Sequence, residues 1–288
     1  MLFRSLLLEG GGVRGLVTGD GRELSANAVI VATGGLSYPS TGSTGDGYRL
    51  AEQAGLAVIP TRPSLVGIDT RESWPGALSG LTLKNVRLTA AQGKKLFYDE
   101  QGELLLTHYG ISGPLALSLS ALLPDDCGGQ VLRLDLKPAL DEKTLDDRFL
   151  RELAKLGRKQ LASVMDSLMP HNLGLALLEM MGLSPALPAH GVTREQRREL
   201  VRQIKGVTLT VLGLRGYEEA VITRGGVDVG GINPSTMGSK SVSGLYFAGE
   251  VLDVDALTGG FNMQIAFSTG ALAGRSAARY IMRDHGGG

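Results

Sequence analysis

Cysteine, aromatic side chains and net charge are all scarce in this 288-residue chain. A single cysteine, Cys127, excludes an internal disulfide framework and any metal cluster built on cysteines. Aromatic residues make up 5% of the chain, which argues against a surface that stacks on bases. Basic and acidic residues number 29 each, so no global charge attracts nucleic acid or an anionic membrane. We expect no nucleic-acid partner, no membrane partner and no metal site.

Long apolar runs are also missing. No run approaches the roughly 20 residues of a membrane span, and Glu9 interrupts the opening stretch MLFRSLLLEGGG before it reaches the length of a signal-peptide core. We therefore expect a cytoplasmic protein. Hydrophobic residues at 43% and charged residues at 20% are typical of a globular protein. Glycine is abundant, with 42 residues, and this suits tight turns and close backbone approaches.

The periodicity of apolar residues predicts an α/β protein with nested insertions. Residues 1–62 indicate a hairpin around Gly19-Asp20-Gly21, a buried strand over 28–32, and a helix with Asp46 as N-cap. The pattern then becomes β-like, becomes helical, and returns to β. We expect a first domain, a β-rich domain inserted into it, and a helical subdomain inserted into that one: 1–62 with 226–288, 63–140 with 206–225, and 141–205.

Gly10, Gly12 and Gly15 match the dinucleotide-binding spacing G-x-G-x-x-G. That motif needs a preceding strand, a helix that begins at the glycines, and an acidic residue about 20 positions further on. Here a hairpin and a strand follow, and no acidic residue occurs between Glu23 and Asp46. We interpret these glycines as turn residues rather than as the nucleotide site.

The stretch from Ser241 to Gly274 carries the strongest chemical signal. A short apolar strand ends in Gly249-Glu250, an acidic loop with Asp253 and Asp255 follows, and Gly259-Gly260 precedes a helix. Glycines at a helix start expose free N–H groups at the positive end of the helix dipole, which suits an anionic or electron-rich ligand. Small residues recur along the helix and predict close packing on a sheet: Ala266, Gly270, Gly274 and Ala277. The alternative for each feature is a tight turn with a solvated acidic loop.

A second glycine-rich loop follows the strand over 28–32. Its sequence, Ala32-Thr33-Gly34-Gly35, lets the backbone come close to a ligand because two residues lack a Cβ. A plain turn is the alternative.

Five stretches occur in the order found in a known family: ATGGLSYPSTGSTGDGY, THYGISGP, TRGGV, TMGSKSVSGLYFAGEVLDVD and TGGFNMQIAFSTG. They resemble the bacterial BaiN-type (YhiN-like) NAD(P)/FAD-dependent oxidoreductases, over nearly the whole chain. The resemblance implies a glutathione-reductase-type FAD domain, with an inserted β-barrel-like domain and a helical subdomain. It also implies FAD as cofactor and NADH or NADPH as electron donor.

The resemblance assigns a role to each glycine-rich segment. Residues Ala32, Thr33, Gly34 and Gly35 would pass close to the FAD. The ribityl and pyrophosphate region would lie against Gly249, Glu250 and Asp253. Further cofactor contacts would come from Gly259, Gly260, Phe261, Asn262 and Gln264, the last four at the pyrimidine end of the flavin.

Two side chains are candidates for direct catalysis. His108 would donate a proton to the substrate; alternatively it bonds the backbone turn before a helix at Pro114, with Ser112 as cap. Arg224 would meet a substrate carboxylate or a flavin carbonyl; alternatively it has a structural role at a domain boundary.

The expected function is therefore hydride transfer from reduced nicotinamide, through FAD, to a small organic acceptor. The family's opening nucleotide-binding unit is missing before Gly10, so we expect this chain by itself to bind FAD weakly or not at all. A non-catalytic remnant or fragment is the main alternative. A different two-domain nucleotide-binding protein would require the segment Thr258–Gln264 to match by coincidence. The acceptor, the choice of NADH or NADPH and the oligomeric state are left open.

Overall fold

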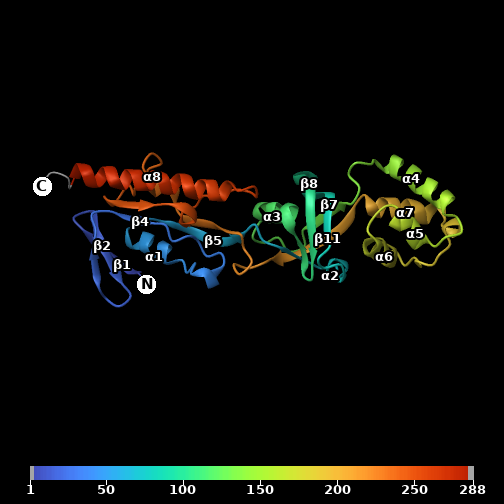
Figure 1. Cartoon of the computed structure of the whole chain (residues 1–288), viewed down its shortest axis with the longest axis horizontal. Coiled ribbons are helices and arrows are strands. Elements are labelled where there is room, and N and C mark those ends of the chain that lie inside the picture. The colour runs from blue at the N-terminus through green and yellow to red at the C-terminus, as the bar shows by residue number, and fades with distance from the viewer. Residues whose placement is uncertain (1–2, 285–288) are drawn as a thin grey trace. The chain divides into compact units, whose positions relative to one another are not determined.

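The computed structural model describes residues 3–284 and divides the chain into two compact units (Figure 1). Unit 1 combines the residues up to Val66 with those from Arg215 on, and unit 2 is the continuous segment Gly67–Leu214. Unit 1 is thus built from both ends of the chain. The expected domain boundaries differ from this division at residues 63–66 and 215–225, which lie in unit 1.

Three small sheets form unit 1 within the described residues: antiparallel β1-β2-β3, parallel β4-β13 and antiparallel β5-β12. The strands are β1 (Phe3–Glu9), β2 (Gly12–Thr18), β3 (Glu23–Ser25), β4 (Val29–Val31), β5 (Val58–Ser64), β12 (Ile222–Val227) and β13 (Leu245–Phe247). The helices are α1 (Asp46–Gln53) and α8 (Phe261–Asp284). Single 3₁₀ turns occur at Pro39–Thr41, Val229–Gly231 and Gly249–Val251.

The glycine match near the N-terminus lies in a hairpin, where Gly10 is a turn residue as predicted. The prediction is wrong for Gly12 and Gly15, which lie in strand β2 and pair with β1. Gly10 and Gly11 have φ of 59° and 79° at the turn between β1 and β2, and Gly15 lies inside β2 rather than at a helix. The hairpin predicted around Gly19-Asp20-Gly21 is confirmed, because the Thr18 N–H donates to the Arg22 carbonyl across 2.9 Å. These glycines therefore shape an antiparallel sheet.

Helix α1 has its N-cap one residue earlier than predicted. The N-cap is Gly45, with φ of 75°, and Asp46 is the first helical residue, so the prediction of Asp46 as N-cap is wrong. A left-handed backbone at the cap favours glycine. The Asp46 carboxylate instead accepts from Thr44 Oγ1 at 3.1 Å and from the Arg49 guanidinium at 3.2 Å. A carboxylate in the first turn still favours the helix dipole.

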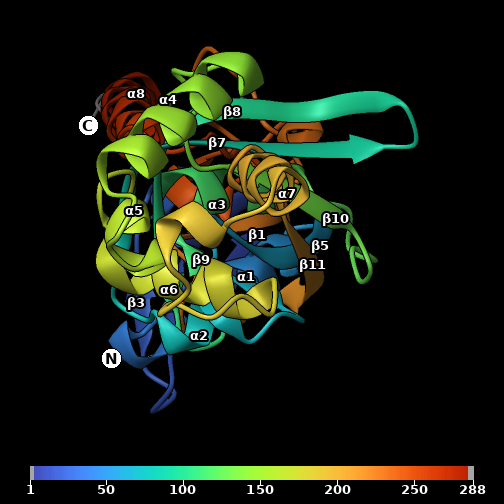
Figure 2. The ribbon, with the colours of Figure 1, turned by 90° about the vertical axis from the view of Figure 1, so that its right-hand side faces the viewer.

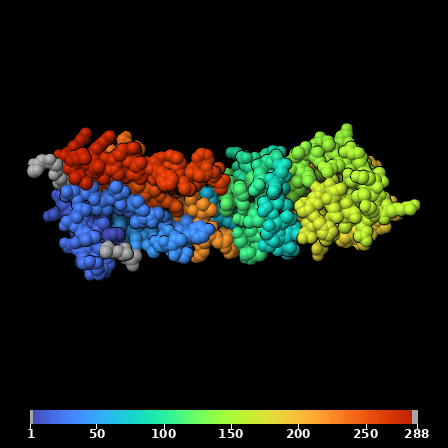
Figure 3. Space-filling view, in the orientation of Figure 1, coloured from blue at the N-terminus to red at the C-terminus, as the bar shows by residue number. Residues whose placement is uncertain are grey.

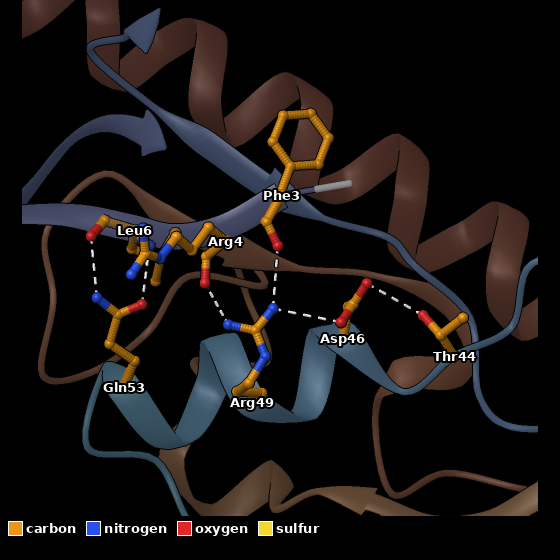
Figure 4. A network of polar contacts seen from close by, with 7 residues as sticks. All are labelled: Phe3, Arg4, Leu6, Thr44, Asp46, Arg49 and Gln53. Carbon is orange, nitrogen blue, oxygen red and sulfur yellow. Dashed lines mark hydrogen bonds and ion pairs between the residues drawn. The ribbon is translucent and has the colours of Figure 1, made fainter. Parts of the chain in front are cut away.

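Side chains of α1 take the place of a neighbouring strand along β1 (Figure 4). The Gln53 amide accepts from the Leu6 N–H at 2.8 Å and donates to the Leu6 carbonyl at 2.9 Å. The Arg49 guanidinium donates to the carbonyls of Phe3 and Arg4. These contacts satisfy backbone groups that an edge strand would otherwise leave to water.

Replacing Gln53 with alanine should lower the free energy of unfolding of unit 1 by about 1–2 kcal/mol, because both Leu6 backbone groups lose their partner. Urea denaturation followed by circular dichroism measures the change. Gln264→Ala is the control in the same unit, since its amide makes an exposed hydrogen bond to Ser268. An equal loss in the two variants would contradict the role given to Gln53.

Helix α8 packs against one side of the parallel strand pair β4-β13. Ala273 and Ala277 of α8 are buried in a cluster with Tyr246 and Ala248. The prediction of close packing holds for Ala277, whereas Gly270 and Gly274 face open space, with no atom within 4 Å of an added Cβ. Much of α8 is exposed, and it forms the red band on the surface of unit 1 in Figure 3.

Unit 2 contains a closed six-stranded barrel, in the order β10-β11-β6-β9-β8-β7. Its strands are β6 (Ile68–Thr70), β7 (Thr82–Gln92), β8 (Lys95–Thr107), β9 (Gly110–Ser112), β10 (Val131–Asp135) and β11 (Val207–Leu214). Strands β7 and β8 form a long hairpin (Figure 2). The helices of unit 2 are α2 (Trp74–Ala77), α3 (Gly113–Leu122), α4 (Glu142–Lys155), α5 (Leu161–Asp166), α6 (His171–Met180) and α7 (Arg194–Ile204).

Barrel and helices of unit 2 share one hydrophobic core. Leu88 and Leu132 from the barrel, and Phe149 and Leu200 from α4 and α7, are all fully buried in the same cluster. Thr193 and Gln196 form the predicted capping box at the start of α7. Within residues 3–284, we find no helix that is both long and apolar enough to span a bilayer.

Candidate functional site

The two predicted glycine loops lie together at one edge of the parallel sheet. Strands β4 and β13 run in the same direction, with Val31 opposite Phe247, so both carboxyl ends point to this edge. The loop Ala32–Gly35 follows β4, and Gly249-Glu250 follow β13; the Ala248 N–H donates to the Val31 carbonyl at 3.0 Å. Ligands of open α/β sheets bind at this kind of edge.

Glu250 and Thr223 fix the loop after β4. Glu250 Oε1 accepts from the Thr223 N–H at 2.7 Å. Thr223, which is 1% exposed, accepts through Oγ1 from the N–H groups of Leu36 and Ser37, at 2.7 and 3.1 Å. Gly35 lies against both side chains, because an added Cβ would stand 2.6 Å from Glu250 Oε1. The backbone of this loop is therefore held in one conformation.

The first turn of α1 packs under the same loop. Gly47 approaches Thr33 and Val251 so closely that an added Cβ would lie 2.8 Å from Val251 Cγ2. Burial raises the pKa of the Tyr48 phenol well above its usual range, and the negative charge of Glu250 adds to this effect. Tyr48 thus stays protonated beneath the loop at any physiological pH.

The start of α8 is an exposed glycine turn with free space around it. Gly259 and Gly260 have φ of 118° and 85°, and nothing lies within 4 Å of a Cβ added to Gly260. Phe261 is 59% exposed. The N–H groups of a helix's first turn have no intrahelical partner, so this end can offer them to a ligand.

Two polar side chains of this turn are engaged locally. The Asn262 side chain accepts from the Ala256 N–H at 2.8 Å and donates to the Ala256 carbonyl at 2.7 Å, which closes the preceding loop. Gln264 Nε2 donates to Ser268 Oγ one turn further along α8. Asn262 therefore shapes the loop, a contact that the motif does not reveal.

The acidic loop and Arg224 also belong to unit 1. The Asp253 N–H donates to the Val227 carbonyl at 2.9 Å, which joins this loop to β12. Arg224, also on β12, has its Nε 3.9 Å from Asp255 Oδ1. This ion pair places a cation and a carboxylate near the glycine loops.

His108 is the one predicted site residue in unit 2. It occupies the turn between β8 and β9, is exposed, and its ring meets the edge of Tyr109 at 5.0 Å between centroids. Ser112 occupies the N-cap position of α3, but its hydroxyl makes no capping hydrogen bond. All other predicted site residues lie in unit 1.

Sequence reasoning missed the hydroxyl groups that support the site. Thr223 holds the loop after β4, and Thr269 Oγ1 accepts from the Gly249 N–H at 3.0 Å. Thr223 directly precedes Arg224 in TRGGV, so the motif contained it. A buried hydroxyl looks the same in a sequence as an exposed one, and only the fold shows its partners.

Residues 5–276 match the family model of the HI0933-like protein Rossmann domain. The chain belongs to the HI0933-like family. It is 32% identical over 266 residues to the 3-dehydro-bile acid delta(4,6)-reductase of Clostridium scindens, a match that covers 91% of this chain and 65% of that protein. This membership confirms the resemblance found in the motifs.

Two further relatives are named for a substrate other than a bile acid. The ribosomal RNA dihydrouridine synthase of Haemophilus influenzae is 38% identical over 253 residues, and that of Escherichia coli is 32% identical over 254 residues. Each of these matches covers 87% of this chain and 60% of the relative. The chain thus spans 60–65% of the length of the curated relatives it matches. The relatives of this chain thus include proteins named for a bile acid and for an RNA.

Proposed function

We propose that this chain forms the flavin-side part of an FAD-dependent oxidoreductase with a glutathione-reductase-type FAD domain. The observation that supports this most is the meeting of two glycine loops at the carboxyl edge of β4 and β13. The activity would be hydride transfer from reduced nicotinamide, through flavin, to a small organic acceptor. A non-catalytic remnant of such a protein is the alternative. We propose the cytoplasm as its location.

The residues at this edge suit a flat ligand with an electron-rich rim. Gly34, in the loop after β4, and Gly260, before α8, have φ of 75° and 85°, and both have open space where a side chain would stand. Ala32 and Thr33 are exposed in the first of these segments, and Gly259 is exposed in the second. A backbone without side chains allows close approach of a ring. These features favour a bound flavin over a plain turn.

Each segment would hold a different part of the cofactor. Ala32–Gly35 would lie along the FAD, and Gly249, Glu250 and Asp253 would contact the ribityl and pyrophosphate region. Flavin, when bound, supplies the redox chemistry. The N–H groups at the start of α8 would stabilise negative charge at the pyrimidine end, near Phe261 and Gln264. Asn262 would keep the loop before α8 in shape through Ala256.

The names of the relatives suggest the class of acceptor. A delta(4,6) bile-acid derivative and the uracil ring that becomes dihydrouridine each contain a carbon–carbon double bond conjugated to a carbonyl group. Reduction of such a bond requires a hydride on one carbon and a proton on the other. We propose an acceptor of this class, with His108 as proton donor and Arg224 as the cation that binds a carbonyl or carboxylate.

The ADP half of the cofactor requires a further unit. Among residues 3–284, no strand leads through G-x-G-x-x-G into a helix. We propose that the residues present here bind FAD weakly or not at all by themselves. The expected result is a purified chain that retains little flavin absorbance after incubation with FAD and gel filtration. Stoichiometric, tight FAD binding would show this proposal to be wrong.

The nucleotide sequence upstream of Met1 would distinguish an FAD-dependent enzyme from a non-catalytic remnant. An in-frame strand followed by G-x-G-x-x-G would allow the extended chain to be produced and tested. We expect it to bind FAD and to oxidise NADH or NADPH in the presence of a conjugated enone. An in-frame stop codon, or an extended chain that binds FAD without any turnover, would favour the remnant.

A further inference from the structure

A pocket with a volume of about 350 Å³ lies in unit 2, between the barrel and the helices. Residues 82–86 of β7 line one part of it, and Leu136 and Lys137, directly after β10, line another. The rest of the lining comes from three residues around the start of α6: Met169, Pro170 and Leu173. The two glycine loops belong to unit 1, so this pocket is separate from the proposed flavin site.

The floor of this pocket is apolar, whereas its exposed edge is mostly polar. The floor consists of five buried side chains: Leu83, Val86, Leu136, Met169 and Leu173. Thr82, Lys84 and Asn85 are exposed at the edge. The volume is near the lower end of the range of roughly 300–1,000 Å³ that is typical of ligand sites. The pocket therefore suits a small amphipathic molecule, and an unbranched chain better than a fused-ring system.

Lys137 is a half-buried cation in this lining, and its ammonium group lacks a counter-ion. Asp135 is engaged elsewhere, because its Oδ1 accepts from the Lys137 backbone N–H at 2.8 Å and its Oδ2 lies 2.6 Å from Lys205 Nζ. Among residues 3–284, no carboxylate forms an ion pair with Lys137 Nζ. Burial lowers the pKa of Lys137, and the positive charge of Arg148 lowers it further. A bound anion would stabilise the charged form of this side chain.

The other charges near Lys137 are also positive. Lys84 lies at the edge of the pocket, and none of the described lining residues is acidic. Arg148 donates through Nη2 to the Ser167 carbonyl at 3.1 Å, so its own hydrogen bond leaves its charge in place. Cations that gather around a pocket without acidic neighbours attract an anion.

We propose that this pocket binds an unbranched aliphatic carboxylate. The alkyl chain would lie against the apolar floor, where each methylene group is removed from water. The carboxylate would accept a charge-assisted hydrogen bond from the Lys137 ammonium, and Lys84 would add positive charge at the edge. The proposal concerns unit 2 and needs no flavin, so it holds or fails independently of the proposed function.

Isothermal titration calorimetry of the purified chain with decanoate, decanol and octanoate tests both halves of the ligand. Decanoate should bind about tenfold more tightly than decanol, because only the carboxylate carries a charge for Lys137. Octanoate, which is shorter by two methylene groups, should bind about fifteenfold more weakly than decanoate, since each buried methylene contributes about fourfold.

Lys137→Met should abolish the preference for the charged ligand. The variant should bind decanoate about tenfold more weakly than the wild type and should keep the wild-type affinity for decanol. A residue that only supported the fold would weaken both ligands alike. Lys155→Met is the matched control, since Lys155 is an exposed lysine on α4 in the same unit, and both affinities should stay unchanged. Circular dichroism verifies that both variants are folded.

Wild-type protein that shows no saturable binding of decanoate, or that binds decanol equally well, would overturn the proposal. A Lys137→Met variant that binds decanoate like the wild type, or that loses affinity for decanol to the same extent, would also overturn it. Tighter binding of cholate, a fused-ring carboxylate, than of decanoate would assign the pocket to a ring system and show the proposed ligand class to be wrong.

Discussion

Replacing Gly35 with alanine should lower the free energy of unfolding of unit 1 by about 3 kcal/mol. The new Cβ would stand 2.6 Å from both Glu250 Oε1 and Thr223 Cβ. Neither neighbour can move freely, because Thr223 is buried and its N–H is bonded to Glu250. The loop must shift, and the hydrogen bonds from Leu36 and Ser37 to Thr223 are then strained or broken.

Gly34→Ala is the matched control at the adjacent position. Its φ of 75° makes alanine unfavourable by about 1–2 kcal/mol, but nothing lies within 4 Å of the added Cβ. Urea denaturation gives both free energies of unfolding, and amide exchange in β4 and β12 locates the change. A larger loss in Gly34→Ala than in Gly35→Ala would contradict the close packing of Gly35 against Glu250.

Unit 2 should lose about 2–3 kcal/mol of stability as the pH rises from 10 to 12. Burial raises the pKa of Tyr98 to about 12 from its usual value of 10, with a smaller contribution from the charge of Glu100. In this window the phenol ionises in the unfolded chain before it ionises in the folded one. The contribution of the protonated Tyr98 phenol to the stability of unit 2 is fully present below pH 10. It is lost as the pH rises through the folded-state pKa.

Tyr98→Phe tests the source of this alkaline loss. At neutral pH the variant should be about 1 kcal/mol less stable, because the Tyr98 hydroxyl donates to the Leu115 carbonyl at 2.9 Å. Between pH 10 and 12 the free energy of unfolding of the variant should fall by less than that of the wild type. The fluorescence of Trp74, the one tryptophan of the chain, reports on the core of unit 2 during urea unfolding.

Val86→Ala provides the comparison for that experiment. Val86 is buried in the same core as Tyr98, so the variant should be less stable at every pH but keep the alkaline loss. If Tyr98→Phe shows the same dependence on pH as the wild type, ionisation of Tyr98 is not the cause.

Local features of this fold could be predicted from the sequence. The turn at Gly19–Gly21, the capping box at Thr193 and the role of Gly10 as a turn residue all follow from residue types within a few positions of one another. The N-cap of α1 was misplaced because Gly45 and Asp46 are both plausible caps, and only the backbone angle separates them.

Contacts between distant segments could not be predicted in this way. Leu36 and Thr223 are 187 residues apart in the chain, and Leu6 and Gln53 are 47 apart. Closure of the barrel likewise depends on β10 and β11, which flank the helices α4 to α7 in the chain. At the site, glycine spacing located the loops, but not the engagement of Asn262 with Ala256 or of Glu250 with Thr223.

The pairing of β4 with β13 has a consequence for how the protein is made. Unit 1 needs both ends of the chain, whereas unit 2 is continuous. Roughly two hundred residues separate the two strands, so at 5–20 residues per second a ribosome needs about 10–40 s between them. Unit 2 emerges complete during that interval and can fold while β4 still lacks its neighbour.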